Sequence, residues 1–181
     1  MPFPDLVHPA LDAYESTVTT PADFADFWAE TLAEARAAGG AVDIVPAETT
    51  LKLVEAFDVT FPGFGGHPIK GWLVLPRERS GGLPLVVQYL GYGGGRGFPH
   101  EQLHWAASGY AYFRMDTRGQ GSGWSMGATP DPVGTTPSLP GVMTKGILER
   151  NDYYYRRLFT DGVRAIDALA DLEPVAAPAD H

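Results

Sequence analysis

Three short stretches of the sequence carry residue types that could perform chemistry, and the first would bind a metal. His100-Glu101-Gln102-Leu103-His104 matches the pattern H-E-x-x-H, in which two imidazoles one helical turn apart bind zinc and the glutamate activates water. The sequence predicts only a short helix here, from Pro99 to Ser108, and no H-x-x-G-x-x-H extension follows it. We therefore expect no metal and no cofactor, and keep a zinc metallopeptidase using His100, Glu101 and His104 as an alternative.

The second stretch would supply a nucleophile. Gly123-Trp124-Ser125-Met126-Gly127 matches G-x-S-x-G, the pattern in which Ser125 would be a catalytic serine. That motif needs a strand before it and a helix after it, because the strained turn between them lifts the hydroxyl above the sheet. Here a glycine-rich loop precedes the motif and a proline-rich segment follows it. We expect Ser125 to be a loop serine.

The third stretch is a glycine-rich turn, Gly91-Tyr92-Gly93-Gly94-Gly95-Arg96-Gly97, directly after an apolar run. A dinucleotide fingerprint fails, because G-x-G-x-x-G counted from Gly91 meets Arg96 and counted from Gly93 meets Phe98. In a serine hydrolase, the turn at this place gives a backbone N–H to the oxyanion hole, and glycines let the main chain approach the substrate carbonyl. A plain structural turn stays open as the alternative.

The elements around this turn predict an α/β fold. Leu85 to Leu90 is a continuous apolar run bounded by Pro84 and Gly91, which is typical of a central strand covered on both faces. The short helix and a second strand, Tyr110 to Met115, follow it. Strand, helix and strand in this order predict a right-handed parallel crossover.

Further elements flank this unit on both sides. Upstream, Thr20-Pro21-Ala22-Asp23 predicts a helix start and Gly39-Gly40 its end, before an antiparallel strand pair over 49–60 and 69–75. Downstream, residues 119–146 predict an irregular loop region. Asn151 can cap the last helix, which Pro174 and Pro178 end, and its predicted apolar face consists of Tyr155, Leu158, Phe159, Val163, Ile166 and Leu169.

Composition limits the class of protein. The 181 residues are 44% hydrophobic, which suggests one domain over residues 1–181. There are 22 acidic against 13 basic side chains and no cysteine, which argues against a nucleic-acid partner and against disulfide or thiolate chemistry. Neither a signal peptide nor an apolar run long enough to span a membrane is present. We expect a soluble protein of the cytoplasm with no membrane partner.

Three long, ordered stretches are distinctive when taken together: Gln88-Tyr89-Leu90-Gly91-Tyr92-Gly93-Gly94-Gly95-Arg96-Gly97-Phe98-Pro99-His100, Met115-Asp116-Thr117-Arg118-Gly119-Gln120-Gly121-Ser122-Gly123-Trp124, and Tyr153-Tyr154-Tyr155-Arg156-Arg157 with Phe159-Thr160-Asp161. They closely resemble the acetyl xylan esterase and cephalosporin C deacetylase family, and the likeness runs from about Phe3 to the last helix. The resemblance implies an α/β-hydrolase, assembled as a cytoplasmic hexamer, that removes acetyl groups from acetylated xylo-oligosaccharides and from cephalosporin C.

The resemblance also implies where the site lies. A Ser–His–Asp triad performs the chemistry in the family, and Tyr92 supplies one oxyanion N–H while its side chain lies beside the acetyl pocket. Bulky residues at Gly91 or Gly93 should displace that N–H. In the family, the triad and the other donor lie after the point that corresponds to His181, so we expect the N-terminal portion of the fold, truncated before the nucleophile elbow and inactive alone. A non-catalytic sugar-binding or assembly fragment is the further alternative.

Overall fold

A β-hairpin forms the middle of the sheet in the computed structural model, which describes residues 5–133, 141–170 and 172. β2 (Val54–Pro62) and β3 (Pro68–Pro76) pair antiparallel along their whole lengths. This confirms the predicted strand pair, although β2 starts five residues later than the predicted span of 49–60. Two glycines with positive φ, Gly65 at 62° and Gly66 at 72°, make the tight connection between the strands.

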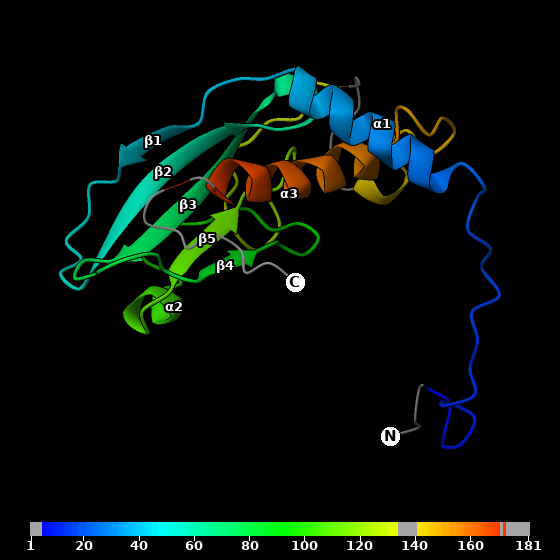
Figure 1. The fold of residues 1–181 in the computed structure, drawn as a ribbon, viewed down its shortest axis with the longest axis horizontal. Coiled ribbons are helices and arrows are strands. Elements are labelled where there is room, and N and C mark those ends of the chain that lie inside the picture. Colours follow the sequence, from blue (N-terminus) through cyan, green and yellow to red (C-terminus); the bar gives the residue numbers. More distant parts are fainter. Residues whose placement is uncertain (1–4, 134–140, 171, 173–181) are drawn as a thin grey trace.

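The sheet has the strand order β1-β2-β3-β5-β4 (Figure 1). β4 (Leu85–Gln88) and β5 (Ala111–Met115) are parallel, which confirms the predicted parallel pairing of these strands. β1 (Asp43–Pro46) pairs antiparallel with β2 and was not predicted. β4 was predicted to be covered on both faces, but it lies at the edge of the described sheet and all four of its residues are partly exposed.

Successive side chains of each strand point to opposite faces, so the sheet has a core on either side. One core contains Leu73, Leu75 and Phe113 and packs under the last helix through Ala165 and Leu169. The other core contains residues of the alternate register, and the short helix closes it; its buried members are Val54, Ala56, Val74, Ala106 and Tyr112. The helices on both faces and the mixed sheet are those of part of an α/β fold.

The helices begin and end at places that only partly agree with the sequence patterns. α1 (Phe24–Ala37) ends before Gly39 as predicted, but its N-cap is Asp23 and not Thr20. The Asp23 side chain does not cap the helix, because it forms an ion pair with Arg150 at 2.5 Å. α2 (His104–Ala107) is a single turn, much shorter than the predicted Pro99 to Ser108.

α3 (Tyr154–Ala170) lies beside α1 and packs against β2 (Figure 1). It begins three residues after the predicted cap, Asn151, and the prolines predicted to end it lie outside the described residues. Between β5 and α3, the described residues are irregular as predicted, apart from a short 3-10 turn at Val142–Thr144. Residues 5–20 are exposed and lead away from the sheet. None of the helices in the described part of the chain is long and apolar enough to cross a membrane.

Candidate active site at the carboxyl end of β4

The parallel pairing of β4 with β5 brings the loops that follow both strands together. Parallel strands end at the same edge of a sheet, and this edge is where ligands of open α/β sheets bind. The loop after β4 contacts the loop after β5 directly, because the Gly123 N–H donates to the carbonyl of Gly93 at 3.0 Å. The indole N–H of Trp124 donates to the carbonyl of Tyr92 at 2.9 Å. The glycine-rich turn therefore rests against a second, equally glycine-rich segment.

One buried carboxylate fixes these loops at the end of β5. Asp116 is fully buried and accepts hydrogen bonds from three backbone amides, those of Arg96 at 2.9 Å, Thr117 at 3.0 Å and Ala128 at 2.6 Å. Three donors to one carboxylate satisfy both of its oxygens without water. Asp116 thus joins the turn after β4 to both ends of the loop after β5.

The glycines of the turn serve different purposes. Gly93 has φ 79°, a conformation that other residues rarely adopt. A Cβ on Gly94 would come within 2.3 Å of the Trp124 ring, and one on Gly95 within 2.3 Å of the backbone of Gly127. A Cβ on Gly91 would meet nothing within 4 Å, and its φ is not positive. The backbone conformation therefore favours glycine at Gly93, whereas neither conformation nor space requires it at Gly91. This separates two positions that the sequence treated alike.

Some of the amides of the turn already have a hydrogen-bond acceptor within the described residues. The Gly93 N–H donates to Oε1 of Gln120 at 2.7 Å, and the Gly94 N–H donates to the carbonyl of Gly91 at 3.0 Å. Within the described residues, the Tyr92 N–H has no acceptor. Among the described residues, the N–H groups of Gly91 and Gly95 also have no acceptor. The assignment of the Tyr92 N–H to an oxyanion hole, which the family resemblance implies, stays a prediction.

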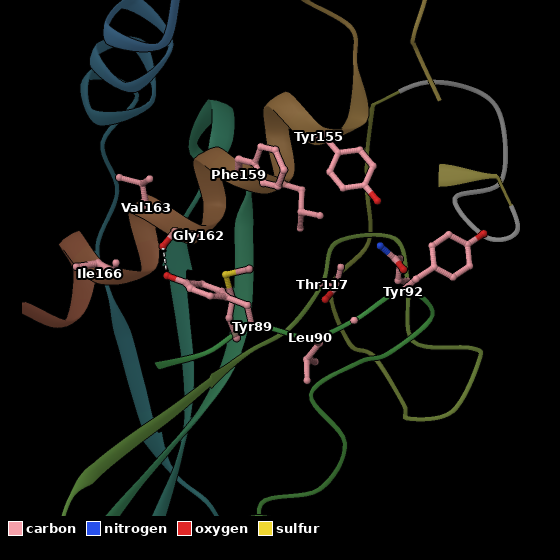
Figure 2. A pocket seen from close by; sticks show the side chains of 13 residues that line it. Tyr89, Leu90, Tyr92, Thr117, Tyr155, Phe159, Gly162, Val163 and Ile166 are labelled. Atoms are coloured by element: carbon pink, nitrogen blue, oxygen red, sulfur yellow. Dashed lines mark hydrogen bonds between the residues drawn. The ribbon is translucent and has the colours of Figure 1, made fainter. Parts of the chain in front are cut away.

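An apolar cavity of about 490 Å³ opens beside this donor (Figure 2). Two of its walls carry most of the aromatic side chains, with Tyr89 and Tyr92 on the segment after β4 and Tyr155 and Phe159 on α3. The end of β5 and the loop after it complete the lining with Met115, Thr117 and Gln120. Figure 2 shows the Tyr89 hydroxyl reaching α3, where it donates to the carbonyl of Gly162 at 2.8 Å. A Cβ on Gly162 would come within 3.3 Å of the Tyr89 ring, so the absence of a side chain there lets the two walls approach. A cavity of this size with a largely apolar lining is typical of a binding site for a small organic molecule.

The face of α3 that the sequence marked as apolar is mostly not its buried face. Of that set only Leu169 is fully buried, whereas Phe159 is 55% and Ile166 is 51% exposed. The buried residues of the helix are instead largely polar: Tyr154, Arg157, Thr160, Asp161, Ala165 and Leu169. The structure places much of this apolar face along the cavity.

Charged side chains account for the polar burial. Arg118 and Asp161 are both fully buried and form a two-pronged ion pair, with N–O distances of 2.5 and 2.7 Å. Asp131 neutralises Arg157 and Lys145, each at 2.9 Å. Burial alone would raise the pKa of Asp131, but hydrogen bonds and charges from Arg157 and Lys145 lower it to about 2. This cluster holds the loop after β5 against α3.

The structure does not support the helix that the zinc alternative required. α2 starts at His104, so His100 lies outside it and the two imidazoles do not share a helix face. The His100 ring stacks on Phe98 with 5.6 Å between ring centroids, and Glu101 pairs with Arg114 at 3.3 Å. In the described ranges, no group of three or more His, Asp or Glu side chains could hold a metal ion.

Ser125 lies in a loop, as the sequence predicted. Bends precede it and no helix follows it, so the strand-turn-helix geometry of a nucleophile elbow is absent here. Its hydroxyl oxygen is buried and has no hydrogen-bond partner in the described part of the chain. No base among those residues therefore activates this serine.

Two residues of the site were not singled out from the sequence. Tyr89 links β4 to α3, and Gln120 holds the turn through its side chain. The available signal for Gln120 was its place just after a strand that ends beside the turn, where polar residues often serve function. Its partner, Gly93, is 27 residues away in the chain, and no local pattern reports such a contact.

Comparisons with known proteins agree with this geometry. The family model for acetyl xylan esterase matches residues 1–177. An acetyl xylan esterase from Paenibacillus sp. R4 superposes with a TM-score of 0.83 and 36% identity, over 94% of this chain and 54% of that one. Acetyl xylan esterase 1 from Thermoanaerobacterium sp. JW/SL YS485 gives a TM-score of 0.81 and 24% identity, over 94% and 53%. The chain spans about half the length of these structures.

Proposed function

The chain belongs to the acetyl xylan esterase family, and on that premise we propose that it forms the acyl-binding part of an acetyl-ester hydrolase. The observation that carries the proposal is the Tyr92 N–H, which has no acceptor among the described residues and lies at the edge of an apolar cavity. An acetyl methyl group would enter the cavity while the carbonyl oxygen accepts from Tyr92. The backbone donor becomes most valuable when that oxygen carries negative charge.

The reaction needs a nucleophile, a base and a second donor in addition to Tyr92. A serine hydroxyl attacks the acetyl carbonyl, a histidine takes the serine proton, and the tetrahedral oxyanion accepts hydrogen bonds from Tyr92 and the second donor. The sugar oxygen then leaves with the histidine's proton, and water releases acetate from the acyl-serine. We assign the serine, histidine and aspartate to the part of the matched structures that this chain does not cover.

The half of the matched structures that this chain does not cover would dock at the edge of the sheet formed by β4. β4 pairs with a strand on one side only in the described sheet. The exposed side chains of Phe159 and Ile166 line the cavity together with the residues that directly follow β4. A parallel strand beside β4 would satisfy the free backbone groups of the edge and cover the apolar wall of α3. The nucleophile elbow of such a strand would then end near Tyr92.

The proposed substrates are short acetylated xylo-oligosaccharides, with cephalosporin C as a further acetyl ester. The proposed setting is a homo-hexamer in the cytoplasm, as the family resemblance implies. The apolar cavity beside Tyr92 supports an apolar acyl group, and the alcohol part of the ester is proposed from the family resemblance alone.

A chimera tests this function. Residues 1–170 are fused to the half of the Paenibacillus enzyme that the chain does not cover, and hydrolysis of a chromogenic acetate and of acetylated xylo-oligosaccharide is measured. We expect multiple turnovers in the chimera, none in the 181-residue chain alone, and no effect of Ser125→Ala. A chimera that unfolds cooperatively yet hydrolyses neither ester would contradict the proposal, and so would activity of the chain alone that Ser125→Ala abolishes.

The lack of an activated nucleophile among the described residues favours a second candidate, a non-catalytic module that binds acetylated sugars. Calorimetric titration of the chain with acetylated and deacetylated xylo-oligosaccharides discriminates the two. Tight binding of the acetylated form by the chain, together with an inactive chimera, would favour the binding module.

A further inference from the structure

A single side-chain amide connects the turn to the buried interior. Gln120 accepts from the Gly93 N–H through Oε1 at 2.7 Å and donates to the Tyr154 hydroxyl through Nε2 at 2.9 Å. The Tyr154 hydroxyl in turn donates to the carbonyl of Arg118 at 2.6 Å. The orientation of the amide is fixed by chemistry, because a backbone N–H can only donate and therefore requires the oxygen of Gln120.

The far end of this chain of hydrogen bonds is rigid. Tyr154 is fully buried on α3, and burial raises its pKa to about 12, so that its hydroxyl keeps its proton and can donate. Arg118 is fully buried, with its side chain paired to Asp161. Gln120 is therefore anchored, through Tyr154, to a backbone carbonyl beside the buried ion pair of Arg118 and Asp161.

The near end, by contrast, is a segment with little rigidity of its own. Four of the five residues from Gly91 to Gly95 are glycine, and glycine has the largest backbone freedom to lose on ordering. An oxyanion donor must be held in place before the reaction, since displacement by even about 1 Å lowers the rate strongly. The side chain of Gln120 provides such a constraint on the peptide that follows Tyr92.

We propose that Gln120 is a positioning residue for the Tyr92 amide. By occupying the Gly93 N–H it fixes the plane of the peptide that follows Tyr92, and it leaves the Tyr92 N–H open to a developing oxyanion. This assignment rests on the proposed function for its catalytic consequence, but the constraint on Gly93 is a property of the chain itself. Two measurements separate these claims.

The first measurement is amide hydrogen exchange of the full 181-residue chain, followed residue by residue by NMR. Gln120→Leu keeps the volume but removes the acceptor, and should lower the protection of Gly93 about tenfold, the worth of one hydrogen bond. Gln120→Glu retains an acceptor and should keep most of the protection of the Gly93 amide. Gln102→Leu, made away from the turn, is the matched control and should leave Gly93 unchanged.

The second measurement is steady-state hydrolysis of a chromogenic acetate by the chimera carrying the same variants. Gln120→Leu should lower kcat about tenfold or more with KM little changed, because a misplaced oxyanion donor is felt in the transition state. Gln120→Glu should recover most of the loss. A purely structural role would lower the melting temperature of both variants without this separation of kcat from KM.

The outcomes are distinct. Loss of Gly93 protection in Gln120→Leu with an inactive wild-type chimera would leave the constraint standing and remove the proposed function. An active chimera in which Gln120→Leu changes neither kcat nor Gly93 exchange would overturn the positioning role. A wild-type chain in which Gly93 exchanges at the unprotected rate would overturn it as well.

Discussion

A helix that packs on a sheet usually buries apolar side chains and exposes polar ones, and the two sides of α3 largely reverse this arrangement. The side toward the interior carries Asp161 and Arg157 in ion pairs, whereas the side toward the cavity carries exposed Phe159 and Ile166. The polar side is complete, because its ion pairs lie within the described residues. The apolar side has area to bury and nothing described that covers it. The contrast shows that the charges buried under α3 are paired within the described residues, whereas its large apolar side chains are left exposed.

The largest expected effect comes from breaking the polar side. Asp161→Ala would leave the Arg118 guanidinium buried and short of its main partner, and loss of one member of a buried pair typically costs about 3–5 kcal/mol. Asp167 lies on the same helix but pairs with Arg36 at the surface, so Asp167→Ala should cost about 1 kcal/mol or less. Urea denaturation of the three proteins measures the difference. Equal losses would refute the distinction between the two sides.

The second prediction compares two aliphatic residues of α3. Leu169 is fully buried and Ile166 is half exposed. Leu169→Ala should destabilise the chain by about 2–5 kcal/mol through the cavity it leaves, whereas Ile166→Ala should change its stability by about 0.5 kcal/mol or less. In the chimera, where the apolar wall of α3 is expected to be covered, Ile166→Ala should lower the stability by more than it does in the chain alone. If Ile166→Ala destabilises the chain and the chimera equally, the apolar wall of α3 is not covered by the half taken from the Paenibacillus enzyme.

Acid titration sharpens the description of the polar side. The pKa of Asp131 is lowered from 3.8 to about 2 in the folded chain, so the folded state favours its charged form. The resulting stabilisation, about 2 kcal/mol, is present above about pH 4 and is lost as the pH falls toward about 2. The difference in unfolding free energy between the wild type and Asp131→Asn should therefore shrink over this range. A difference that stays constant from about pH 5 to about pH 2 would contradict the assignment.

The smallest expected effect concerns the turn. Gly93→Ala places a side chain at φ 79° and should cost about 1 kcal/mol, whereas Gly91→Ala meets open space and should be close to neutral. The chimera should lose acetyl-ester turnover with Gly93→Ala and retain it with Gly91→Ala. Comparable losses of turnover in both would restore the equivalence that the sequence suggested.

Local patterns predicted the elements whose causes are local. The alternation and turn glycines around Gly65 indicated the β2–β3 hairpin, and the apolar runs at Leu85 and Tyr110 indicated the parallel pair. β1 was missed because its four residues, Asp43–Pro46, lack the continuous apolar run that indicated the equally short β4. α2 is shorter than predicted because Pro99 and His100 form a turn and Glu101 a bend before it. The boundaries of such elements depend on packing against residues that are distant in the sequence, which a short stretch of sequence does not report.

The candidate site was predictable only at its centre. Tyr92 and Gly93 belong to a glycine-rich turn directly after a strand, and such a turn is visible in a short window of sequence. The burial of α3 was not predictable, because periodicity shows that a helix has an apolar face but not which side packs on the sheet. The partner that decides it, Arg118, lies 43 residues before Asp161. Gln120 was missed for the same reason.

Trp124 has an optical consequence. Its indole covers Gly94, donates to the carbonyl of Tyr92 and is 61% exposed, so its emission depends directly on the conformation and hydration of the turn. The other three tryptophans, Trp28, Trp72 and Trp105, pack against other partners. With these three replaced by phenylalanine, Trp124 becomes an intrinsic fluorescent probe, and entry of an acyl group beside Tyr92 can be followed in real time without a label.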